Sequence, residues 1–173
     1  MYRDHTIERT PDEMHDNHSS VFHRNYADLG LLVLRLGIGF SMLLLHGWGK
    51  ISAGPEQWER IGGSMANLGI DFLPVFWGFM AAFSEFFCSA FLVLGVFFRP
   101  AAFLLMGTML VAAVRHLSLP AGEPGSGFSG ASHALEFLTV YVALFLTGPG
   151  RYRLSALWQR RPATKQLQPG EGI

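Results

Sequence analysis

Residues 29–47 read LGLLVLRLGIGFSMLLLHG, an almost unbroken apolar run that decides the fold class of the chain. Three more apolar runs follow, at residues 74–98, 101–119 and 133–149. A helix of about 17 to 25 mostly apolar residues crosses the roughly 30 Å hydrocarbon core of a membrane. We therefore predict an all-α integral membrane protein, an antiparallel bundle of four transmembrane helices.

The composition agrees with this prediction. Of the 173 residues, 50% are hydrophobic and 15% are charged, which is typical of a membrane protein and not of a soluble one. The formal net charge is zero and no phosphate-binding Gly-rich motif occurs, so we expect the lipid bilayer and no nucleic acid as a partner. Cys88 is the single cysteine, which excludes an intramolecular disulfide and a dithiol redox centre.

The placement of Lys and Arg predicts the orientation of the helices. Nine of these residues fall on the side of the two termini: Arg3, Arg9, Arg24, Arg99, Arg151, Arg153, Arg160, Arg161 and Lys165. The opposite side carries only Lys50, Arg60 and Arg115. Because basic residues concentrate in cytoplasmic segments, we expect both termini in the cytoplasm.

Three parts of the chain differ in polarity. Residues 1–28 form a polar tail, residues 29–150 the membrane domain and residues 151–173 a basic tail. Between the first two spans, Trp58, Ile61 and Met65 recur at helical spacing beside polar residues, which predicts an amphipathic helix at the membrane interface. The N-terminal tail is rich in His, but its spacing is specific to no metal, so we predict no metal site.

Ionisable side chains inside the apolar runs are the candidate functional residues. Arg35 and Glu85 are placed near the middle of the first and second spans, where an unpaired charge is costly. Counted from Gly47 and Pro74 at 1.5 Å per residue, both lie about 16 to 18 Å below the outer helix ends. We therefore expect them to form an ion pair, which could equally be a purely structural lock.

A second polar cluster is predicted nearer the outer surface. Its members are His46, Lys50, Arg115, His116, His133 and Glu136. One hypothesis is a single polar pocket, open to the outer face, that binds a ligand or relays protons. That pocket would be lined by Arg35, His46, Lys50, Glu85, His116 and Glu136. In the alternative, these side chains reach interfacial water and form no site.

Several short motifs together resemble the DoxX family of small bacterial membrane proteins with four helices. They are Leu34-Arg35-Leu36-Gly37, His46-Gly47-Trp48-Gly49-Lys50, Glu85, Leu94-Gly95, Arg99-Pro100-Ala101-Ala102, His116, Glu136 and Gly148-Pro149-Gly150-Arg151-Tyr152. The resemblance spans residues 28–154. It departs from the family after Tyr152, where Arg153-Leu154-Ser155 replaces the usual Ser-Leu-Asp.

The resemblance implies a location and a function class. It implies a multi-pass protein of the bacterial cytoplasmic (inner) membrane. It also implies an accessory subunit of a quinone- or redox-linked membrane complex, because the family takes its name from a thiosulfate:quinone oxidoreductase subunit. Other protein subunits are then the expected partners and quinone the expected cofactor, with none bound covalently. A non-catalytic scaffold subunit and a small-solute carrier stay open as alternatives, and no catalytic residue is assigned.

Overall fold

The computed structural model describes residues 11–154 and 156 of the chain, with side chains from Asn25 onward. Every regular element in these residues is a helix. In chain order they are α1 (Pro11–Ser41), η1 (Met42–Gly47), α2 (Trp48–Ile51), α3 (Pro55–Gly62), η2 (Gly63–Leu68), α4 (Pro74–Phe83), η3 (Ser84–Cys88), α5 (Ser89–Leu94), α6 (Phe98–Ser118) and α7 (Gly127–Thr147). η1 and η3 are π-helical turns, and η2 is a 3₁₀ helix.

Four helical segments are long and apolar enough to cross a membrane. They are Asn25–Ile51, Pro74–Leu94, Phe98–Ser118 and Gly127–Thr147. The prediction of a four-helix membrane fold is therefore confirmed; the second span begins at Pro74 as predicted, and the other boundaries move by one to six residues. The fourth helix begins at Gly127, before the predicted start at residue 133. The prediction missed its first turns because they are rich in Gly, Ser and Ala, which do not form an apolar run.

The first helix also extends beyond its apolar run. It begins at Pro11, inside the segment predicted as a polar tail. Pro fits the first turn of a helix. The predicted basic tail beyond Ala156 and the first ten residues lie outside the described residues.

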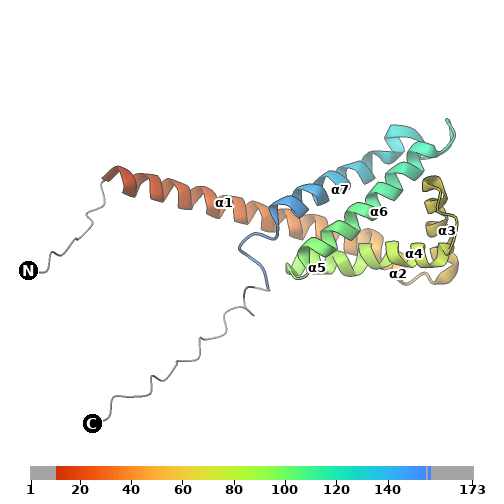
Figure 1. Cartoon of the computed structure of the whole chain (residues 1–173), viewed down its shortest axis with the longest axis horizontal. Helices are drawn as coiled ribbons and strands as arrows, with labels where there is room; N and C mark the ends of the chain where they lie inside the picture. The colour runs from red at the N-terminus through yellow and green to blue at the C-terminus, as the bar shows by residue number, and fades with distance from the viewer. Residues whose placement is uncertain (1–10, 155, 157–173) are drawn as a thin grey trace, which may run out of the picture.

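The two ends of the bundle differ. At the tail end, α1 enters the bundle, the turn Gly95–Phe97 joins α5 to α6, and the chain leaves α7 through Pro149. At the α3 end, α3 and η2 connect the first and second spans (Figure 1). In Figure 1, α6 and α7 run side by side and lean away from α4 toward the α3 end.

Glycines allow two very close helix contacts. A Cβ atom on Gly62 would overlap the carbonyl of Pro74, and one on Gly78 would overlap the backbone of Trp58, so α3 packs directly on α4. A Cβ atom on Gly47 would lie 2.6 Å from the carbonyl oxygen of Glu85, so η1 packs directly on η3. Small residues at helix crossings are the usual device of membrane bundles. Both contacts position the polar side chains described next.

Candidate functional site

Arg35 is bound entirely by main-chain carbonyls at the tail end. Its Nε donates to Leu92 (3.1 Å), and its Nη2 donates to Val93 (2.9 Å). Its Nη1 donates to the carbonyls of Pro149 and Tyr152, the latter at 2.8 Å. The side chain is 1% exposed and also lies over the ring of Phe98. The guanidinium thus joins α1 to the end of α5 and to the segment after α7.

The predicted Arg35–Glu85 ion pair is wrong. Glu85 lies opposite Gly47, and Gly47 is about 18 Å farther along the first span than Arg35 at 1.5 Å per residue. The prediction took Gly47 and Pro74 as helix ends at one level. In the structure α4 extends past Gly47, and its first turns pack on α3.

Glu85 instead pairs with Lys50. Lys50 Nζ donates to Glu85 Oε1 at 2.6 Å. The Glu85 side chain is 2% exposed, whereas the Lys50 side chain is 32% exposed. The pair therefore has one buried partner and one that solvent or a ligand can reach.

Both residues of the Lys50–Glu85 pair lie in or close to a π-helical turn. η3 carries Glu85, and η1 directly precedes the short helix α2 that carries Lys50. A π turn inserts one extra residue into a helix, rotates the side chains that follow, and occurs frequently at functional sites. The two π turns face each other at the Gly47 contact. Both spans therefore depart from regular α-helix near the Lys50–Glu85 pair.

A cavity of about 410 Å³ adjoins the ion pair. Its walls come from α3, η2, α4, η3 and α6, with Lys50 and Glu85 among the lining residues. Most of the lining is apolar, in contrast to the polar pocket predicted from the sequence. Phe76 and Phe103 contribute to the lining from α4 and α6 and are half exposed, so the cavity reaches the lateral surface of the bundle.

Three residues that line the cavity each carry a buried polar atom without a hydrogen bond. Among the described residues, Trp77 Nε1, Ser84 Oγ and Glu85 Oε2 are buried and make no hydrogen bond, and all three residues line the cavity. A buried polar atom without a hydrogen bond destabilises a protein, so such atoms are rare unless a ligand or water satisfies them. An apolar cavity with a few unsatisfied polar groups is the usual form of a small-molecule site.

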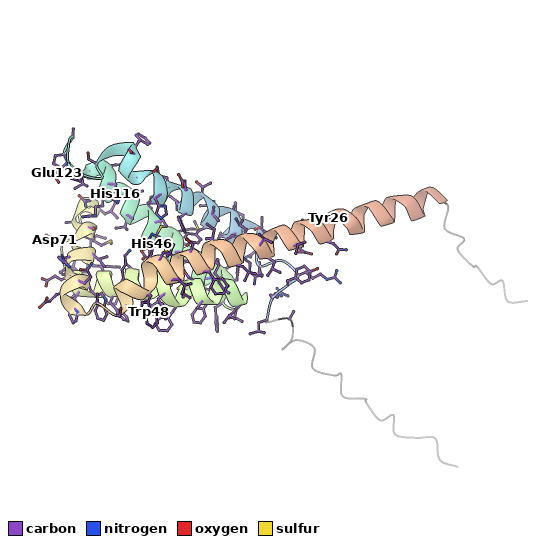
Figure 2. The ribbon with its side chains drawn as sticks, turned by 180° about the vertical axis from the view of Figure 1, so that it is seen from behind. Tyr26, His46, Trp48, Asp71, His116 and Glu123 are labelled. Atoms are coloured by element: carbon purple, nitrogen blue, oxygen red, sulfur yellow. The ribbon has the colours of Figure 1, made fainter. Side chains whose placement is uncertain are left out.

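The remaining predicted site residues do not line this cavity. His46 contacts His133 with an Nε2–Nε2 distance of 3.2 Å, and His116 Nδ1 lies 2.8 Å from the carbonyl oxygen of Gly125 in the α6–α7 loop. Glu136 is exposed on α7. Figure 2 shows His116 near Glu123 of that loop, while His46 lies on the first span. Of the six residues predicted to converge, the structure brings together only Lys50 and Glu85 at the cavity.

Trp77 and Ser84 are among the cavity residues that were not predicted as site residues, although each has a buried polar atom without a hydrogen bond. The sequence did hold a signal, because Trp77, Ala81, Ser84 and Glu85 follow each other at helical spacing and share one face of the second span.

Comparison with known proteins gives one family. The model of the DoxX family matches residues 30–117, which include most of the first span, the whole second span, the cavity and most of α6. No curated protein and no solved structure gives a significant match.

Proposed function

The chain belongs to the DoxX family of membrane proteins, and on this premise we propose that it binds a quinone-class molecule in the cavity beside Lys50 and Glu85. In this role it serves as an accessory subunit of a quinone- or redox-linked membrane complex. The observation that carries the proposal is an otherwise apolar cavity lined by an ion pair whose buried carboxylate has one oxygen without a hydrogen bond.

The chemistry of a quinone matches the lining. An apolar ring and isoprenoid tail suit the aromatic and aliphatic walls, and a cavity of about 410 Å³ lies within the usual range for small-molecule sites. The two quinone carbonyls need hydrogen-bond donors, and the partly exposed Lys50 Nζ at the cavity is one such donor. Glu85 carries a carboxylate that can accept a proton when a bound quinol is oxidised.

The position of the cavity supports entry from the bilayer. Phe76 and Phe103 are partly exposed at its border, so a lipid-soluble ligand can pass between α4 and α6 without crossing water. Oxidation of a bound quinol releases two electrons and two protons. Glu85 accepts one proton, the other passes to water, and both electrons pass to an acceptor in another subunit, because the single cysteine of the chain cannot form a dithiol redox centre.

The test is quinone binding to the full chain in lipid nanodiscs, measured by quenching of Trp fluorescence with a short-chain ubiquinone. Gly107 lines the cavity, and a Cβ atom there meets nothing within 4 Å, so Gly107→Phe fills the cavity without a backbone clash. We expect this variant to bind at least about tenfold more weakly, a difference of about 1.4 kcal/mol.

Gly37→Phe is the matched control. Gly37 is exposed on α1, also has free space around it, and does not line the cavity. It should bind like the unmodified chain. Absence of saturable binding by the unmodified chain would reject quinone as the ligand, and equal binding by Gly107→Phe would reject the cavity as the site.

A non-catalytic scaffold is the second candidate function, and Arg35 favours it. Its guanidinium joins three parts of the chain through main-chain carbonyls and leaves no donor directed at a cavity. A scaffold holds its partner subunits whether or not the cavity is filled. Co-purification of the same subunits with the Gly107→Phe variant, combined with no quinone binding by the unmodified chain, would favour this function.

A further inference from the structure

His46 and His133 form a close pair that the proposed quinone site does not use. The two residues come from η1 and α7, and their Nε2 atoms are 3.2 Å apart. The ring centroids lie 5.1 Å apart with an interplanar angle of 30°. Because the Nε2 atoms are much closer than the ring centres, the rings converge at their Nε2 edges. Neither residue lines the cavity beside Glu85.

The spacing of the two nitrogens equals that of two ligands on one metal ion. Imidazole nitrogen lies about 2.0 to 2.1 Å from a bound transition metal, and tetrahedral ligands subtend about 109°. Two such nitrogens are then about 3.3 to 3.4 Å apart by the same geometry. The observed 3.2 Å needs almost no movement of either side chain. Imidazole is also the side chain that Cu²⁺, Zn²⁺ and Ni²⁺ prefer in common.

The surroundings leave one side of the pair open. His133 is exposed and His46 is half-buried. The buried ring of Phe137 packs against both, with its centroid 4.7 Å from that of His133 and 6.1 Å from that of His46. No group of three or more His, Cys, Asp or Glu side chains in residues 25–154 and 156 is placed to hold a metal. Within the described residues, the positions beyond the two histidines therefore have no His, Cys, Asp or Glu ligand and can take an exogenous one.

We propose that His46 and His133 bind one divalent transition-metal ion at the α3 end of the bundle, with its other positions open to exogenous ligands. Cu²⁺ binds most tightly, since it leads the affinity order of these ions at nitrogen sites. The ion joins the first and last spans of the bundle. This site is separate from the quinone cavity and does not depend on the proposed function.

The experiment is Cu²⁺ titration of the full chain in detergent, followed by electron paramagnetic resonance. The N-terminal tail holds His5, His15, His18 and His23, which would also bind Cu²⁺. The parent protein for the test therefore carries Asn at these four positions and a purification tag without His. We expect one Cu²⁺ per chain, with hyperfine coupling to two imidazole nitrogens.

His133→Asn is the decisive variant because His133 is the exposed member of the pair. It should lose the two-nitrogen signal and bind Cu²⁺ at least about tenfold more weakly than the parent. His116→Asn replaces a histidine held by the α6–α7 loop and should keep the parent's stoichiometry and spectrum. If His133→Asn binds like the parent, or the parent binds no Cu²⁺, the 3.2 Å contact is a hydrogen bond that shares a proton and the metal site is rejected.

Discussion

Arg35 and Glu85 are both buried charges in the membrane part of the chain, yet the structure satisfies them in different ways. Each of the three guanidinium nitrogens of Arg35 donates to at least one main-chain carbonyl. Glu85 has one oxygen on Lys50 and a second oxygen without a hydrogen bond, beside a cavity. The hydrogen bonds of Arg35 therefore hold helices together. The unpaired oxygen of Glu85 beside the cavity is still able to bind a ligand.

Removal of the Arg35 guanidinium should give the largest loss of stability. Arg35→Met leaves the carbonyls of Leu92, Val93, Pro149 and Tyr152 without a donor, and we expect a loss of about 3 to 5 kcal/mol in the free energy of unfolding. Arg35→Lys should not rescue it, because an ammonium cannot reproduce the planar fork of donors. Denaturant unfolding in detergent measures both, with the exposed Arg99 as the control site. A loss below about 1 kcal/mol would mean that Arg35 is not a structural lock.

Disruption of the Lys50–Glu85 pair should cost less, because Lys50 reaches solvent when its partner is removed. We expect Glu85→Gln to lower the free energy of unfolding by about 1 to 3 kcal/mol and to weaken quinone binding as well. A double-mutant cycle with Lys50→Met should show coupling of about 0.5 to 3 kcal/mol.

A second double-mutant cycle, between Arg35 and Glu85, tests whether these two charges interact. Glu85 lies opposite Gly47, which is about 18 Å farther along the first span than Arg35, so the effects of the two substitutions should add within about 0.5 kcal/mol. Strong coupling between Arg35 and Glu85 would support the ion pair that was predicted from the sequence.

The α3–α4 contact should give a smaller effect that is specific to the cavity. Gly62→Ala places a Cβ atom against the carbonyl of Pro74, and we expect overpacking to cost about 1 to 3 kcal/mol and to displace α3, which lines the cavity. Gly63→Ala is a matched control one residue later, since a Cβ atom there meets nothing within 4 Å. Quinone affinity and thermal unfolding of both variants separate the two effects. Equal behaviour of the two would show that the close approach of α3 is unimportant.

His116 should give the smallest effect. Its hydrogen bond to the carbonyl of Gly125 holds an exposed loop, so we expect His116→Ala to cost about 0.5 to 1.5 kcal/mol and to leave quinone affinity unchanged. Thermal unfolding and fluorescence quenching measure the two quantities. A large change in affinity would indicate that His116 belongs to the ligand site, as the sequence suggested.

The sequence predicted the four spans because apolar runs of membrane length are a local signal. It also marked Lys50 and Glu85 as candidate residues, since ionisable side chains in such runs are rare. It could not pair them, because the level of Glu85 depends on how far α4 extends past Gly47. That offset is set by the Gly47 and Gly62 contacts and by two π turns, none of which follows from helical periodicity.

The histidines show the same limit. His46 and His133 were assigned to one cluster near the outer surface, and the structure places them in contact. His116 was assigned to that cluster by depth alone, but its ring bonds to the loop that follows α6. Depth along a helix can be estimated from sequence, whereas the direction of a side chain depends on which helices are neighbours.

We propose that the ligand binds in the cavity beside Lys50 and Glu85, and not around Arg35 at the tail end of the bundle. The most direct measurement is photolabelling of the full chain in nanodiscs with an azido-quinone, followed by mass spectrometry of the labelled peptides. We predict labels on the cavity segments of α4 and α6, around Trp77, Met80 and Thr108, that excess unlabelled quinone suppresses. Labels at Gly95 to Arg99 that excess quinone suppresses would place the site at the tail end of the bundle. Labels that excess quinone leaves unchanged would show that the chain has no specific quinone site.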